Sequence, residues 1–390
     1  MSPFDRLKRL FERKSYSLSA PDFPLSIFGV TTSASGVAVT AASAMRVPAV
    51  AAAVELIASA IGTLPVKVYS REGGGKIADP DHPAHTLVHD EANPWTSAAD
   101  LRTQITADAL LNDRGGFAFV VRVDGRPVEL HRLDPAAVTV KIDKNTGEPV
   151  YLVSTDAGQV QHPFTDIVHL RPFAGQSPIT RAREAIALAL VLEEHAAGIF
   201  TKGAKPSGIL SFAENIGDER IARVRKAFQS EGRGGLAILD NDAKYQPFTL
   251  SSVDNQFAEM RHFQIEEISR AFRVSPVFLS ELGRATWSNA EQMGKQFLTY
   301  TLRPWLEQWV SQYRRTLLTD DERASVVIEF VADDLLTVDH ATRANAYGQY
   351  RSMGVMTANE VRAGLNLPAH ANGNDLANPY TTSGTTKDAA

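Results

Sequence analysis

The chain has 390 residues, of which 44% are hydrophobic and 22% are charged, and it contains no cysteine. These proportions exclude a fully disordered chain, and at roughly 100–200 residues per domain the length allows about two to four domains. Without cysteine, the chain has no disulfides, thiolate nucleophiles, Cys-ligated zinc or iron–sulfur clusters. The formal net charge of -5 argues against tight wrapping of nucleic acid, which needs a surplus of Lys and Arg facing phosphate.

The first 45 residues are expected to form an N-terminal arm. Residues 1–14 are basic and place four apolar side chains on one helical face (Phe4, Leu7, Leu10 and Phe11), whereas residues 15–44 lack helical periodicity. The basic stretch is either a frayed end or a docking helix for a partner or an acidic surface. No apolar run follows it, so it lacks the pattern of a signal peptide.

The best candidate for a membrane span is the Ala-rich segment 47–66, which carries Glu55 near its middle. A carboxylate at that depth costs several kcal/mol in a bilayer, and Ala compensates for little of this. We therefore expect a buried helix, and a soluble protein or part of a soluble assembly with no membrane partner.

The first half of the chain is typical of an α+β domain. Helices are predicted over 49–61, after Pro48, and over 98–112, with Thr96 or Ser97 as the cap. Residues 87–93 are predicted to be the end of another short helix. Strands are predicted over residues 64–69, 116–123, 128–133, 138–142, 150–154 and 167–170. Turn signals such as Asp124-Gly125 separate the strands, which favours antiparallel hairpins over a doubly wound sheet.

Two long helices are predicted next, over 181–200 and 254–272, on either side of a small α/β insert at 205–250. They return the chain to the point where it left the main domain, which makes an antiparallel stalk with a cap. The first helix is apolar nearly all round its middle, so it should be buried on several sides. One chain offers too few neighbours, and we therefore expect several copies to lie side by side.

The last third begins with a polar loop, 282–289, followed by the longest predicted helix, 290–318. Pro304 lies in its interior, where it removes a hydrogen bond and bends the helix. The bend suits either a part shaped to follow something outside the chain or an ordinary kinked core helix. A strand over 326–331, helices over 342–353 and 357–365, and a mobile tail from residue 369 complete the prediction.

Catalytic signatures are scarce. The sequence has no GxxxxGK[ST] and no GxSxG, and the GxGxxA at 232–237 precedes a predicted strand where a dinucleotide site needs a helix. Asp333, Asp334 and Asp339 could form an acidic two-metal site, but acidic residues are common where strands end. We expect no catalytic residues, no cofactor and no enzymatic activity.

Three histidines, His82, His85 and His89, have a spacing that can hold a metal ion, and the last two can share a helix face. Pro83 interrupts the run, however, and no fourth ligand is obvious. A solvated helix end is the favoured interpretation, and no metal site is expected.

One segment carries a family resemblance. Residues 254–292, DNQFAEMRHFQIEEISRAFRVSPVFLSELGRATWSNAEQ, resemble the signature stretch of tailed-phage portal proteins of the long-tailed type and of gene transfer agent portals. Further stretches agree in the family's order: SPITRAREAIALAL, FTKGAKPSGIL, TYTLRPWLEQW and TANEVRAGLNLP. Together they cover roughly residues 46–367.

The resemblance implies the portal fold, with an α/β wing, a two-helix stem, a small α/β clip, a tunnel loop, a long kinked helix and a short helical crown. After the arm 1–45, it assigns 46–180 and 291–336 to the wing, 181–204 and 251–275 to the stem, 205–250 to the clip, 276–290 to the tunnel loop, 337–367 to the crown and 368–390 to a flexible tail.

The implied function is a dodecameric ring at the capsid vertex, the conduit for DNA packaging and ejection. The implied partners are further copies of the chain, double-stranded DNA, the major capsid protein, the terminase large subunit and the head–tail adaptor. The protein would belong to the virion, and to the host cytoplasm during assembly. In this family the terminase hydrolyses ATP, which fits the missing phosphate-binding loop.

Three sets of site residues follow. DNA-facing residues of the tunnel loop are expected to be Arg284, Thr286, Trp287 and Ser288; inter-subunit residues of the stem Ile186, Leu190, Phe257 and Phe263; and partner-binding residues of the clip Arg220, Arg223 and Arg225. Arg284 either contacts phosphate or pairs with Glu281 or a neighbouring subunit. Trp287 packs either between subunits or against DNA.

The sequence also allows two other functions. One is a monomeric adaptor or minor head protein, which predicts that the stalk helices pack within one chain. The other is a metal-dependent phage nuclease, which predicts that Asp333, Asp334 and Asp339 converge on a divalent ion.

Overall fold

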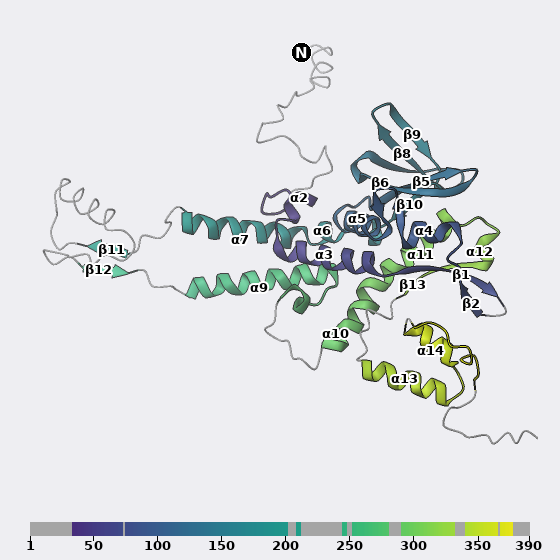
Figure 1. Ribbon diagram of the computed structural model, residues 1–390. Coiled ribbons are helices and arrows are strands. Elements are labelled where there is room, and N and C mark those ends of the chain that lie inside the picture. Colours follow the sequence, from purple (N-terminus) through teal and green to yellow (C-terminus); the bar gives the residue numbers. More distant parts are fainter. Residues whose placement is uncertain are drawn as a thin grey trace, which may run out of the picture.

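The computed structural model describes residues 33–72, 75–201, 208–211, 244–247, 252–280, 290–331, 340–365 and 367–376. Figure 1 shows a body of helices and small sheets from which α7 (Arg183–Thr201) and α9 (Ser252–Phe272) project side by side. Every strand pair in this part of the chain is antiparallel. This confirms the α+β class predicted from the turn signals.

The first sheet joins the two ends of the body. β1 (Val66–Glu72) lies between β2 (Gly75–Ala78) and β13 (Val326–Phe330). Val66 pairs with Phe330 and Ser70 with Val326, so the strand that follows the long helix returns to the start of the domain.

Two further sheets carry the predicted hairpins. One has the order β10-β5-β6, built from β5 (Gly116–Val123), β6 (Arg126–Leu133) and β10 (Ile167–Leu170). The other has β7 (Val138–Ile142), β8 (Pro149–Thr155) and β9 (Gly158–His162). Asp124 and Gly125 turn the chain between β5 and β6 with φ values of 51° and 79°, as a two-residue hairpin requires.

Two helices form the centre of the core. α3 (Pro48–Thr63) has Pro48 in its first turn and covers the predicted range 49–61. α5 (Ala98–Leu111) begins after Ser97, whose hydroxyl accepts a hydrogen bond from the Asp100 amide at 3.0 Å. The helices touch at Gly62, where a Cβ atom would lie 1.9 Å from Thr103 Oγ1.

The helix predicted to end at Asn93 is placed differently. α4 spans Pro83–His89, and residues Glu91–Asn93 form the short strand β3, which pairs with β4 (Thr96–Ser97). Pro83 therefore starts the helix instead of interrupting it, because a proline in the first turn lacks only an N–H that has no partner there. The chain leaves the helix at Asp90, and the side-chain Nδ2 of the buried Asn93 donates to the Leu130 carbonyl at 2.8 Å.

The long helix is continuous but not uniform. It consists of α10 (Ala290–Gln296), a π-helical segment, η6 (Phe297–Leu302), and α11 (Arg303–Leu317). Pro304 lies in the first turn of α11, so the irregularity that proline predicts takes the form of the π-helical turn directly before it.

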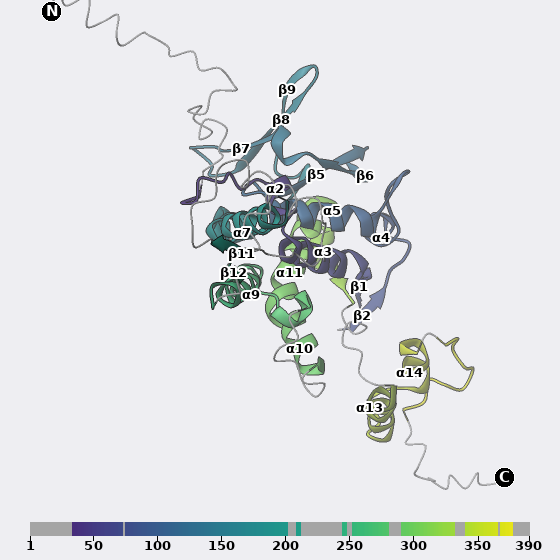
Figure 2. The same cartoon turned by 90° about the vertical axis from the view of Figure 1, so that its left-hand side faces the viewer.

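α13 (His340–Ser352) and α14 (Ala358–Gly364) lie beside the body in both views (Figures 1 and 2). Residues 369–376, which belong to the tail expected to be mobile, are held near α14 by side-chain hydrogen bonds. The Asn359 Nδ2 donates to the His370 carbonyl at 2.9 Å, and Asn359 Oδ1 accepts from the His370 amide at 2.7 Å. Side-chain to backbone bonds of this kind leave no apolar periodicity in the sequence. Residues 377–390 lie outside the described residues.

The remaining elements are short: α2 (Ala41–Ala44), η2 (Pro135–Ala137), η3 (Phe173–Gly175), α6 (Pro178–Arg181), β11 (Gly208–Ser211), β12 (Lys244–Pro247), η4 (Pro276–Leu279) and α12 (Glu322–Ser325). β11 and β12 pair with each other and belong to the predicted insert, most of which lies outside the described residues. Among the helices of the described chain, none combines the length and apolar character needed to cross a bilayer.

Candidate functional site

The helix pair α7–α9 packs against the body at one end only. Figure 2 looks along the pair and shows both helices next to α3. Ile186, near the start of α7, is fully buried in the main core, and Leu190 is partly buried against the same core. The prediction for Ile186 is therefore wrong, because a side chain with no exposed surface in its own chain cannot contact a neighbouring copy. Leu190 keeps some accessible surface.

The outer face of α9 carries exposed apolar side chains. Phe263 is 52% exposed and Met260 is 43% exposed, and both lie on this projecting helix. The Arg270 guanidinium lies 5.9 Å from the centre of the Phe263 ring and also pairs with Glu266 and Glu267. Large apolar groups at such a surface are typical of contact sites for another molecule. Phe257 belongs to α9, but its side chain lies outside the described residues.

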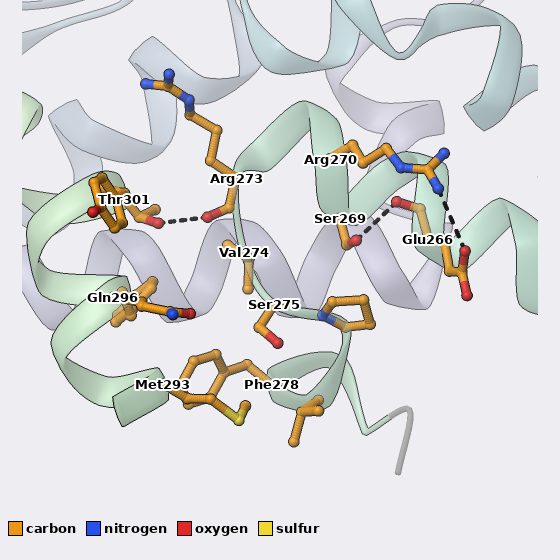
Figure 3. Close-up of a pocket in the computed structure, with 14 residues that line it drawn as sticks. Glu266, Ser269, Arg270, Arg273, Val274, Ser275, Phe278, Met293, Gln296 and Thr301 are labelled. Atoms are coloured by element: carbon orange, nitrogen blue, oxygen red, sulfur yellow. Dashed lines mark hydrogen bonds and ion pairs between the residues drawn. The ribbon is translucent and has the colours of Figure 1, made fainter. Parts of the chain in front are cut away.

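A cavity of about 640 Å³ lies where α9 ends (Figure 3). Its walls come from the end of α9, from η4, and from α10 and η6 of the long helix. Residues 281–289, between η4 and α10, lie outside the described residues, so this cavity is bounded by the two segments that begin and end that loop. Its walls are the structural base of the expected tunnel loop.

The chain turns sharply at this base. Arg273 adopts a left-handed conformation with φ of 59°, and the Val274 amide donates to the Ser269 carbonyl at 3.0 Å, which closes α9. Across the cavity, the Thr301 hydroxyl donates to the Arg273 carbonyl, as Figure 3 shows. A hydrogen bond from the π-helical segment thus holds the turn that leads into the loop.

The cavity combines aromatic and charged groups. The rings of Phe278 and Phe297 lie 5.4 Å apart, and the two arginines on the wall, Arg270 and Arg273, face solvent. Burial, followed by the nearby Arg273 cation, lowers the pKa of Arg181 below its usual value. The described lining residues include no nucleophile–base pair.

Most of the predicted site residues cannot be placed. Arg284, Thr286, Trp287 and Ser288 in the loop and Arg220, Arg223 and Arg225 in the insert lie outside the described residues, as do Asp333, Asp334 and Asp339. Arg273 and Thr301 are not among the predicted site residues. A left-handed arginine has no sequence signal comparable to glycine, and a hydroxyl-to-carbonyl bond across 28 residues has none at all.

Comparisons with known proteins identify the family. The profile of the phage portal protein family matches residues 48–366. The probable portal protein of Streptomyces phage phiC31 is 30% identical over 355 residues, which are 85% of this chain and 76% of that protein. The portal protein of Enterobacteria phage HK97 is 27% identical over 356 residues, covering 86% of this chain and 83% of the other.

Solved structures show the same fold. A chain in the virion of a native gene transfer agent particle superposes with a TM-score of 0.64 at 21% identity, over 85% of this chain and 94% of that one. An HK97-family phage portal protein from Corynebacterium diphtheriae gives a TM-score of 0.50 at 17% identity, over 76% and 97% of the two chains. The chain belongs to the phage portal protein family, and this confirms the resemblance seen in residues 254–292.

Proposed function

We propose that this protein is the portal subunit of a tailed phage or gene transfer agent particle. In this proposal it forms a ring at the capsid vertex, through which DNA is packaged and ejected and to which terminase and the head–tail adaptor dock in turn. The observation that carries the proposal is the family match over residues 48–366, which spans nearly all of the described chain.

The proposed division of the chain follows the family. Residues 46–180 and 291–336 are the wing, 181–204 and 251–275 the stem, 205–250 the clip, 276–290 the tunnel loop, 337–367 the crown, with the arm 1–45 and the tail 368–390 outside them. The pairing of β1 with β13 supports one wing built from two parts of the chain. The hydrogen bonds between His370 and Asn359 place the start of the tail against α14 of the proposed crown.

The outer face of the stem supports the proposal that the chain forms a ring. Met260 and Phe263 leave apolar surface exposed in a single chain, and burying such surface contributes ~25 cal/mol per Å². A solved relative is the neck of a native gene transfer agent particle computed with C12 symmetry, which supports twelve copies here. The partners expected in the particle are the major capsid protein, the terminase large subunit and the head–tail adaptor.

The proposed role as a DNA conduit depends on the loop between η4 and α10. The Thr301–Arg273 hydrogen bond and the Phe278–Phe297 contact fix the base of that loop, so its tip can face DNA from a defined position. The net charge of -5 fits a channel, because each extra cation facing phosphate adds affinity and a ring multiplies it by the copy number. Arg284 is the loop cation proposed to contact phosphate transiently.

The protein acts structurally in this proposal, and ATP hydrolysis belongs to the terminase. A monomeric adaptor would leave Met260 and Phe263 exposed, and a nuclease would need Asp333, Asp334 and Asp339 to converge. Neither alternative explains the family match over the whole body.

Native mass spectrometry of the purified full chain, with negative-stain images, tests the proposal. We expect a closed ring of about twelve copies, as in the C12 neck of the relative. If the chain alone gives a monomer, the measurement is repeated after co-expression with its capsid and scaffold proteins. A chain that stays monomeric there contradicts the portal function and favours the adaptor.

A further inference from the structure

Helix α4 lies at the far side of the body from the helix pair α7–α9 (Figure 1). At its end, two histidines and an aspartate converge. The ligand atoms of His85, His89 and Asp90 all lie within 4.8 Å of one another. Among the residues that the structure describes, this is the one group of three such side chains that could hold a metal ion. The spacing of His85 and His89 indicates two of these three side chains in the sequence, whereas Asp90 carries no such signal.

The helix brings the histidines together. His85 and His89 are one turn apart on α4, and their rings stack with centroids 4.8 Å apart and an angle of 18° between the planes. α4 ends at His89, so Asp90 turns back toward the rings. Its carboxylate lies 2.8 Å from His89 Nδ1 and 3.9 Å from His85 Nδ1. Three donor atoms therefore face one small volume.

The surroundings favour a bound cation. The carbonyl end of a helix carries partial negative charge, and Asp79 adds a carboxylate nearby, opposed by Lys67 on β1. The side chains are 16%, 35% and 53% exposed for His85, His89 and Asp90, which leaves a path for an ion and room for water ligands.

We propose that His85, His89 and Asp90 bind a divalent transition-metal ion such as Zn²⁺, with water completing its coordination. Two imidazoles and one carboxylate suit zinc, nickel or copper, whereas magnesium and calcium prefer sets made of oxygen alone. The ion ties the last turn of α4 to the residue that leads into β3. It thereby stabilises this edge of the body, and the site is independent of the proposed portal function.

Isothermal titration of the full chain, prepared without a histidine tag, tests the site with ZnCl₂, NiCl₂ and MgCl₂. We expect one Zn²⁺ or Ni²⁺ per chain and no binding of Mg²⁺. The double variant His85→Ala/His89→Ala and the single variant Asp90→Asn should each weaken Zn²⁺ binding by roughly tenfold or more. Affinity should fall at acidic pH, because protons compete with the metal ion for its ligands.

His131→Ala is the matched control. His131 also meets a carboxylate, Glu129 Oε2 at 2.7 Å, but belongs to no group of three ligands. This variant should bind Zn²⁺ like the unchanged protein. Zn²⁺ should also raise the melting temperature of the unchanged protein and of His131→Ala, but not that of the double variant. Absence of Zn²⁺ binding by the unchanged protein, or equal binding by the double variant, overturns the proposal.

Discussion

Trp309 Nε1 donates a hydrogen bond to Thr106 Oγ1 over 3.1 Å in the centre of the core. Both residues are fully buried, Trp309 on α11 and Thr106 on α5. The two helices are separated in sequence by the helix pair and by the insert. This bond therefore joins the first and second parts of the proposed wing, and the projecting helices leave from a body that is closed behind them.

We expect Thr106→Val to destabilise the fold by about 1–3 kcal/mol, because it leaves the buried Trp309 N–H without a partner. The free energy of unfolding from urea denaturation measures this. Trp305→Phe is the control. Trp305 lies one helical turn before Trp309 and is half-buried, so this change should lower the free energy of unfolding by less. Equal stabilities of Thr106→Val and the unchanged protein would show that the bond contributes nothing.

Phe263→Asp should block assembly of the oligomeric ring and leave the fold intact. Phe263 is 52% exposed in one chain, and the change would place a charge at the proposed stem contact. Native mass spectrometry gives the assembly state, and circular dichroism and thermal melting verify the fold. Val160→Asp on β9, with 45% exposure far from the helix pair, is the matched control and should assemble.

Leu190→Asp is a less selective change. Leu190 packs partly against the main core of its own chain, so an aspartate there should lower stability as well as assembly. Normal rings from Phe263→Asp would show that α9 does not supply the contact between subunits.

Replacing residues 281–287 by a Gly/Ser stretch of equal length should leave rings intact but impair DNA packaging or retention. The walls at the loop's base, held by Thr301 and Arg273, remain unchanged in this variant. Nuclease-protected DNA in assembled particles is the measurement. Arg284→Ala alone separates the loop cation from loop shape, and wild-type packaging in both variants would remove the loop from the mechanism.

Stability should depend on pH through His169. This imidazole contacts Tyr151 Oη at 3.0 Å and donates through Nε2 to the Arg114 carbonyl at 2.8 Å. Burial is the largest cause that lowers its pKa from 6.5 to about 4. The unfolded chain binds this proton more readily than the folded chain, so stability is complete above pH ~6.5 and is lost as the pH falls toward ~4, by up to ~3 kcal/mol.

His169→Gln cannot titrate, so its urea unfolding should show less change in stability between pH 7 and pH 4 than the unchanged protein does. His131→Gln serves as the control, because that side chain remains accessible to water. A slope that is the same in His169→Gln and the unchanged protein would assign the pH dependence to other groups.

Local signals predicted much of the architecture. Pro48 predicted the start of α3, the Asp124-Gly125 pair predicted the β5–β6 turn, and Ser97 predicted the cap of α5. Each of these features depends on the backbone preferences of a few neighbouring residues, and such preferences can be recognised in the sequence itself. The ordered motifs around residues 254–292 also sufficed to indicate the family, which the match over residues 48–366 confirms.

Tertiary structure decided which surfaces meet. Helical periodicity shows that Ile186 and Phe263 are apolar, but only the packed chain shows that Ile186 is buried and Phe263 exposed. In the same way, Asp90 comes within 4.8 Å of the ring nitrogens of His85 and His89 because α4 ends at His89. Burial and convergence depend on segments far away in the sequence, whereas propensity depends on neighbours, and this is why the sequence alone determined the elements and the family but not their contacts.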